Sequence, residues 1–393
     1  MSAAAVTRRV QRFLLVALVF LVAWQVAALA GTSRHVQVVL GLYGFVLHVV
    51  FAKAYSLVPS YFARELSVPR APAVQLPLSA LGVVGLAAAG LGAPAVVGTA
   101  GAALWLAGVL VFVGALGWTV RDNLTGAETG TGEAKADRRA VDRYANAFVP
   151  VVLAYLLAGS YDLLAARVGL LTVAASAGPP TVHLLAAGAA TLLVLAVGFR
   201  LLPRLLVASP PRAVVAVALP AGALGPVLLA GAFLDGLLFE VGALAEAVAV
   251  VGFAAALWWM FAESDRRRVG GYALVVGAGM GVLGVALGLD FAFRGPTPAL
   301  GDAHARLNLL GFLGLSIVGA TYHFYPPAAG RFPGAGDRTA LVTVALLSGG
   351  VLVEVVGLAA GVAWPVFLGR IAALAGAVGY AYLIAGLLRQ NRG

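Results

Sequence analysis

Residues 304–326 read HARLNLLGFLGLSIVGATYHFYP, an apolar, glycine-containing stretch with polar rings near both ends. An α-helix rises about 1.5 Å per residue, so a stretch of this length crosses the roughly 30 Å hydrocarbon core of a bilayer. His304 and Arg306 lie at its beginning and His323 lies near its end. The pattern predicts a membrane-spanning helix whose chemistry is confined to its two ends.

The composition of the whole chain agrees with this local interpretation. Of the 393 residues, 62% are apolar and 11% are charged, and the mean hydropathy is +0.98. Such values exclude a water-soluble globule and indicate a membrane protein with many spans. The chain contains no cysteine, which excludes disulfides, thiolate metal sites and a cysteine nucleophile. The net charge of +10 is assigned to membrane topology rather than to nucleic-acid binding.

Apolar runs long enough to cross a membrane follow one another along the chain, which predicts an all-α polytopic fold with twelve spans. The first run is interpreted as an uncleaved helix rather than a signal peptide, because it is long enough to span a bilayer by itself. The expected spans are 11–31, 35–58, 75–95, 97–119, 146–166, 180–202, 213–233, 238–262, 269–290, 301–325, 339–361 and 364–388.

The basic residues of the connecting segments are distributed unequally between the two sides. Twenty lie in the termini and the even-to-odd connections, whereas the opposite connections hold only Arg34, Arg167 and Arg294. Cytoplasmic loops of membrane proteins are enriched in Lys and Arg. We therefore expect a plasma-membrane protein with both termini in the cytoplasm.

A polar segment at 121–145 mixes both signs of charge and is predicted to be a flexible cytoplasmic loop. Four spans precede it, and a second basic segment, DRRR at 265–268, follows the eighth span. The chain is therefore expected to form one transmembrane domain of three four-helix units, at about 11–119, 146–262 and 269–388.

The three expected units share one internal repeat. The second, sixth and tenth spans begin with His35, His183 and His304, and each reaches a proline 20 to 24 residues later. By the charge pattern, all three histidines lie at the outer side. A histidine at a span end is also compatible with simple solvation among lipid headgroups. Three in equivalent places, out of five in the chain, favour a shared role.

Other polar residues are expected inside or at the ends of the spans. His48 lies about 20 Å deeper than His35, where a hydrogen bond to a neighbouring helix carbonyl or a functional role would explain it. His323 is expected to cap the tenth span at its cytoplasmic end. The intramembrane carboxyl groups are candidates for proton or ion routes, or for protonated groups hydrogen-bonded between helices. They belong to Asp162, Glu246 and Glu354.

Twelve spans, internal termini and histidines on the second, sixth and tenth spans resemble subunit I of the heme–copper oxidases, the family of cytochrome c oxidases and nitric oxide reductases. The tenth span is the most similar, because the family's helix opens with His-x-His and closes with a His-aromatic-aromatic-Pro stretch. The second span, HVQVVLGLYGFVLHVVFAKAYSLVP, resembles the helix that carries a low-spin heme ligand. The resemblance covers the architecture of the whole chain, and its motifs cover these two spans.

The resemblance implies roles for individual residues. His304 matches the axial ligand of the high-spin heme, His35 matches a low-spin heme ligand, and His183 loosely matches a copper ligand. The second histidine of His-x-His is Arg306 here, and a guanidinium has no lone pair for iron. The seventh span also lacks the histidine pair that copper needs, so a copper centre is not expected.

Two interpretations of Arg306 follow from its place on the helix. Its side chain either reaches the outer surface and pairs with Asp302 one turn earlier, or binds an anionic group such as a heme propionate. The guanidinium fork suits a carboxylate in both cases.

Two classes of function remain. In the first, the protein binds one b-type heme through His304, His35 or both, for electron transfer or gas binding. If such a protein were an enzyme, it would be an oxidoreductase of the heme–copper oxidase superfamily without copper. It would not be expected to reduce dioxygen. In the second, the scaffold has no cofactor and is a transporter-like or assembly protein. The expected partners are the lipid bilayer, and an electron donor or small membrane subunits, but no nucleic acid.

Overall fold

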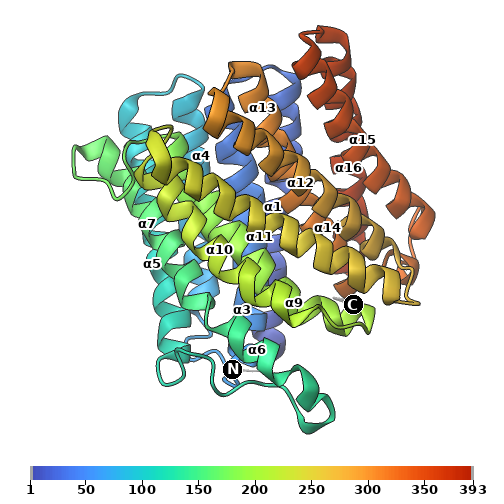
Figure 1. The fold of residues 1–393 in the computed structure, drawn as a ribbon. Coiled ribbons are helices and arrows are strands. Elements are labelled where there is room, and N and C mark those ends of the chain that lie inside the picture. The colour runs from blue at the N-terminus through green and yellow to red at the C-terminus, as the bar shows by residue number, and fades with distance from the viewer. Residues whose placement is uncertain (1–2, 391–393) are drawn as a thin grey trace. The chain divides into compact units, whose positions relative to one another are not determined.

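A computed structural model describes the backbone of residues 3–390 and the side chains from Arg9 onward. Within this part of the chain every regular element is a helix and there is no strand (Figure 1). Twelve helices are long and apolar enough to cross a membrane. The prediction of an all-α membrane protein with twelve spans is confirmed.

The spans agree with the expected ranges to within five residues, except that the first helix begins earlier. Three of the spans are each built from three consecutive helical segments. The spans are α1 (Ala3–Leu29), α2–η1–α3 (Arg34–Val38, Val39–Val46, Leu47–Tyr61), α4 (Ala71–Gly90), α5 (Ala95–Val120), α7 (Val149–Val168), α8–η3–α9 (Pro179–His183, Leu184–Thr191, Leu192–Leu206), α10 (Arg212–Gly231), α11 (Gly236–Glu263), α12 (Val269–Arg294), α13–η4–α14 (Pro298–Arg306, Leu307–Gly314, Leu315–Phe324), α15 (Asp337–Ala360) and α16 (Ala363–Gln390).

The chain packs as two compact units, and the expected grouping into three four-helix units is not confirmed. The first unit comprises residues 1–16, 47–201 and 211–249. The second comprises residues 17–46, 202–210 and 250–393. Each unit therefore combines segments that are distant in sequence.

The three segmented spans share a π-helix, an uncommon form with wider turns that is frequent at functional sites. The π-helices η1, η3 and η4 are each eight residues long and lie on the second, sixth and tenth spans, the same spans that begin with histidine. His35 precedes its π-helix by four residues, His183 by one and His304 by three. Successive residues on a helix point about 100° apart. The backbone therefore repeats, but the three histidines do not occupy one equivalent register.

Glycines let each π-helix pack closely on a large side chain of a neighbouring helix. A Cβ atom added to Gly41 would lie 2.7 Å from the ring of Trp24, and one added to Gly188 would lie 2.5 Å from the ring of Tyr155. A Cβ on Gly311 would lie 2.8 Å from the side chain of Met280. Small residues at helix interfaces are typical of membrane proteins, in which close packing replaces the hydrophobic drive.

Candidate functional site

A buried carboxylate holds two arginines in the second unit. Glu354 on α15 accepts a 2.7 Å hydrogen bond from Nε of Arg306 on α13 and a 2.8 Å bond from Nε of Arg370 on α16. The Glu354 side chain is fully buried and that of Arg306 is 4% exposed. The expected pair of Arg306 with Asp302 is wrong, because the Arg306 side chain points into the bundle. Asp302 pairs instead with Arg34, at 2.5 Å.

Helix α1 supplies the remaining neighbours of Arg306. Its Nη2 donates a 2.9 Å hydrogen bond to Oε1 of Gln25, and its Cζ lies 5.1 Å from the centre of the Trp24 ring. The other terminal nitrogen, Nη1, is buried and has no hydrogen-bond partner, and the same is true of Nε2 of Gln25 and Nε1 of Trp24. Three buried N–H donor groups without acceptors therefore lie near one guanidinium, and such groups are costly in an apolar interior.

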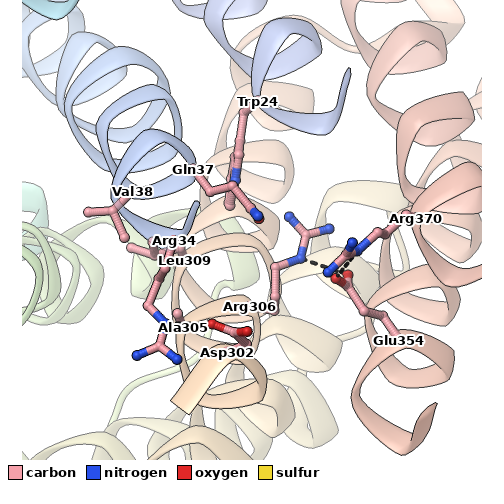
Figure 2. A pocket seen from close by; sticks show the side chains of 10 residues that line it. All are labelled: Trp24, Arg34, Gln37, Val38, Asp302, Ala305, Arg306, Leu309, Glu354 and Arg370. Carbon is pink, nitrogen blue, oxygen red and sulfur yellow. Dashed lines mark hydrogen bonds and ion pairs between the residues drawn. The ribbon is translucent and has the colours of Figure 1, made fainter. Parts of the chain in front are cut away.

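A cavity of about 20 Å³ lies beside this cluster (Figure 2). Its lining includes Trp24, Arg306, Glu354 and Arg370, together with the more exposed pair of Arg34 and Asp302. A cavity holds a water-sized group when it offers roughly 10–15 Å³ to that group. The cavity is thus large enough for one such group, and its exposed ion pair lies at the side where solvent enters.

The charges that line the cavity do not cancel. Three guanidinium groups face two carboxylates, which leaves one excess positive charge. Each carboxylate is engaged by an arginine, whereas Nη1 of Arg306 is unpartnered. The arrangement offers donors and positive charge to a ligand, which suits an acceptor carrying one negative charge.

His304 is half-buried on α13. Its Nδ1 lies 2.9 Å from the carbonyl oxygen of Gly284, which can only accept, so Nδ1 is the donor of this hydrogen bond. Its ring packs 5.5 Å from that of Phe291. A hydrogen bond from the far nitrogen to a carbonyl is the usual support of a histidine ligand.

The other histidines at span ends lie in different surroundings. His35 is exposed at the start of α2. His183 is half-buried on α8, where Nδ1 donates to the carbonyl of Pro179 at 2.8 Å. His323 lies on the last turn of α14, with Nδ1 donating to the carbonyl of Gly319 at 2.8 Å. Among the described residues, no three histidine or carboxylate side chains form a group that could hold a metal ion.

His48 lies in the aromatic core of the first unit. Its Nε2 is 3.1 Å from the hydroxyl oxygen of Ser79 on α4, and its ring packs against those of Phe13, Phe51 and Trp105. The hydrogen-bond partner on the neighbouring helix is thus the hydroxyl of Ser79, and the ring belongs to an aromatic cluster.

Asp162 on α7 holds the connection that follows this helix. Its two carboxyl oxygens accept the backbone N–H groups of Val173 at 2.7 Å and Ala174 at 2.8 Å. Both bonds require acceptors, which the two carboxyl oxygens supply. The partners shown for Asp162 thus belong to the backbone of the connection rather than to a neighbouring helix.

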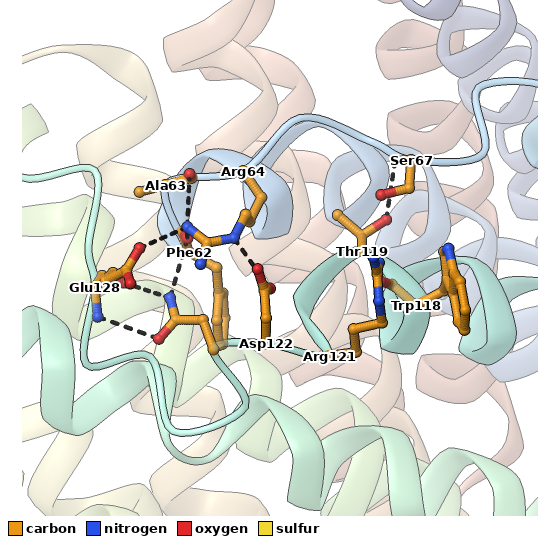
Figure 3. Close-up of polar contacts among 10 residues, drawn as sticks. Phe62, Ala63, Arg64, Ser67, Trp118, Thr119, Arg121, Asp122 and Glu128 are labelled. Atoms are coloured by element: carbon orange, nitrogen blue, oxygen red, sulfur yellow. Dashed lines mark hydrogen bonds and ion pairs between the residues drawn. The ribbon is translucent and has the colours of Figure 1, made fainter.

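The segment at 121–145 is more structured than its composition predicts. It contains the 3₁₀-helix η2 (Glu133–Arg138) and most of α6 (Arg139–Asn146). At its start, Arg64 donates to Asp122 at 3.1 Å and to Glu128 at 2.7 Å (Figure 3). These hydrogen bonds raise the pKa of the Arg64 guanidinium, and the bond from Arg64 holds the pKa of Asp122 below its ordinary value.

Sequence reasoning did not connect Trp24, Gln25 and Arg370 with Arg306. One signal was available, because Arg370 lies inside the expected twelfth span, 364–388, rather than in a connection. Gln25 is also a polar residue in an otherwise apolar run. A buried charge within a span needs a partner, so Arg306 and Arg370 could have been matched with Glu354.

No protein-family model matches this chain, and the search of curated proteins finds no match. The function is therefore inferred from the chain's own residues. The resemblance to heme–copper oxidase subunit I stays a prediction.

Proposed function

We propose that this protein is a membrane carrier that binds a small monovalent anion at the cavity beside Arg306. The observation that carries the proposal is the buried Nη1 of Arg306, which has no acceptor among the residues that the structure describes. An anion supplies that acceptor and offsets the excess positive charge of the cavity lining. This is the transporter-like class of the two that the sequence suggests.

The chemistry of the cavity favours a small ligand. Its volume of about 20 Å³ admits one group of water size, such as a halide ion or one oxygen of a small oxyanion. Glu354 excludes divalent anions in part, because a second negative charge would lie unbalanced beside it. The exposed pair of Arg34 and Asp302 gives the ligand a polar entrance.

The direct test measures whether anions stabilise the purified protein. The midpoint of thermal unfolding is recorded in chloride, nitrite, formate and a bulky organic anion at one ionic strength. A ligand that binds the folded state raises its stability by RT ln(1 + [L]/Kd), which is about 2.7 kcal/mol at one hundred times Kd. Stabilisation by the small anions alone supports the proposal. Equal unfolding midpoints in all four salts would contradict the proposal and would indicate that water rather than an anion occupies the cavity.

A second candidate function is binding of a b-type heme through His304. The hydrogen bond from Nδ1 to the carbonyl of Gly284 favours it, because a bond of this kind orients and supports a histidine ligand. Such a heme would supply electron transfer or gas binding. The other implied groups fit less well, since His35 is exposed and Arg306 already engages Glu354.

An absorption spectrum of the detergent-purified protein, expressed with ample heme, distinguishes the two candidates. A Soret band that is lost in His304→Ala and kept in His323→Ala supports heme binding. His323 is a suitable control because its Nδ1 makes the same kind of bond to a carbonyl. The absence of a Soret band, or a band that is unaffected by His304→Ala, rules this candidate out.

A further inference from the structure

A second polar site lies in the first unit, around Glu246 on α11. This carboxyl is 7% exposed, and its Oε1 is buried and has no hydrogen-bond partner. It lies away from Arg306 in the sequence and belongs to the other compact unit. We propose that Glu246 is a proton-binding site, which takes up a proton from water and carries it as a neutral carboxylic acid against α10.

The backbone of α10 is shaped to receive this carboxyl. A Cβ atom on Gly225 would lie 2.7 Å from Cγ of Glu246 and 2.8 Å from its Oε1. Any larger residue at 225 would displace the side chain. Glycine thus brings the carboxyl into direct contact with the main chain of the neighbouring helix.

The same stretch of α10 has carbonyl groups without their helical donors. Pro220 and Pro226 lie inside the helix, and proline has no N–H to give to the carbonyl four residues earlier. The carbonyls concerned belong to Ala216 and Gly222. The Ala216 carbonyl accepts the hydroxyl of Tyr144 at 3.2 Å.

The second proline leaves an acceptor about one turn from Gly225, the glycine that contacts Glu246. Pro226 is adjacent to Gly225, and the carbonyl that it leaves without a donor is that of Gly222, one turn earlier. Beside it, the hydroxyl of Tyr155 on α7 donates to the carbonyl of Ala223 at 2.5 Å. This region of α10 therefore offers acceptors, and a protonated carboxyl brings the O–H donor that an ionised one lacks.

The charges nearby favour the neutral form. Tyr155 is the titratable side chain of α7 that interacts electrostatically with Glu246. Helix α10 has no titratable residue after Arg212 at its start, and on α11 the preceding acid is Glu240. None of these is a cation beside the carboxyl, so an ionised Glu246 would be buried and uncompensated. Protonation moves one proton from hydronium to the carboxylate, forms one O–H bond and leaves water.

Infrared spectroscopy of the purified protein tests the proposal. A protonated carboxyl gives a C=O stretching band apart from that of carboxylates, and an exchangeable proton shifts this band in D₂O. We expect the band in the wild type, its shift in D₂O and its loss in Glu246→Gln. Glu240→Gln, which changes a partly exposed acid on the same helix, should keep it. A band that persists in Glu246→Gln or does not shift in D₂O would overturn the proposal. If Glu246→Gln does not fold, a wild-type protein without the band overturns it equally.

Discussion

Arg306 and Arg370 share one carboxylate. Nε of Arg306 lies 2.7 Å from Oε2 of Glu354, and Nε of Arg370 lies 2.8 Å from its Oε1. One buried negative charge thus pairs with two positive charges, of which Arg306 is buried and Arg370 is partly exposed. Both arginines are paired with Glu354, but its single negative charge does not neutralise both of them.

The variant Glu354→Gln tests two properties of this cluster, namely its contribution to stability and its excess positive charge. The substitution leaves the buried Arg306 and the partly buried Arg370 without their carboxylate, and loss of one partner of a buried pair costs about 3–5 kcal/mol. It also removes one negative charge from the cavity lining, so added anions should restore more stability than they give the wild type. Thermal unfolding across a chloride series measures both effects. Reduced stability with no greater response to chloride would contradict the assignment of the surplus charge.

The packing of the π-helices predicts a second result. Gly41→Ala would bring a methyl group within 2.7 Å of the Trp24 ring, and overpacking of this kind costs about 1–3 kcal/mol. Gly114→Ala is the matched control, because this glycine on α5 has open space around it. Alanine is the better helix former, so the control should be neutral or stabilising by up to about 1 kcal/mol. Equal stabilities of the two variants would show that the close approach of η1 to α1 is not required.

The start of the loop at 121–145 should respond to acid. The folded-state pKa of Asp122 is lowered by the hydrogen bond from Arg64, so the stabilisation is present above the ordinary pKa of about 4 and is lost as the pH falls through the folded value. The protection of the amides at 122–128, measured against the intrinsic exchange rate at each pH, should therefore fall in this acidic range. Asp122→Asn should show the faster exchange already at neutral pH. If Asp122→Asn showed the same amide hydrogen exchange as the wild type at neutral pH, the Arg64–Asp122 hydrogen bond would not hold the start of this loop.

The charge asymmetry predicts the orientation of the spans. The chain has no cysteine, so single cysteines can be added without removing native ones. Thr125 and Ser176 are exposed in connections that the pattern assigns to opposite sides. In intact cells a membrane-impermeant maleimide should label Ser176→Cys and not Thr125→Cys. The reverse labelling would invert the topology.

The spans were predictable because each is a long apolar run bounded by charged or turn-forming residues. The segmentation of three spans into α and π parts was not, since a π-helix differs from an α-helix by one hydrogen-bond step and has the same apolar composition. The histidine repeat marked the three spans that contain it. It could not show that His35, His183 and His304 lie at different distances from their π-helices.

The site was predictable only in part. Glu354 was recognised as an unusual carboxyl inside a membrane, which follows from the cost of burying a charge, and Arg306 was recognised as a candidate anion-binding residue near the outer end of its span. Their pairing was not, because residues 306 and 354 lie on different helices and a sequence does not show which helix faces pack together. Local spacing favoured Asp302 as the partner of Arg306, and the folded chain gives Asp302 to Arg34 instead.

The central claim is that Arg306 binds a small anion, and the most direct measurement compares the anion dependence of unfolding in Arg306→Gln and Arg294→Gln. Arg294 is an exposed arginine paired with Asp290 at a helix end, so its loss should leave the chloride and nitrite dependence of the wild type unchanged. Trp24→Phe, which removes the indole N–H but keeps a buried aromatic ring, should weaken the dependence. We predict that Arg306→Gln abolishes the anion-dependent rise in the unfolding midpoint. An undiminished rise in Arg306→Gln would contradict the account.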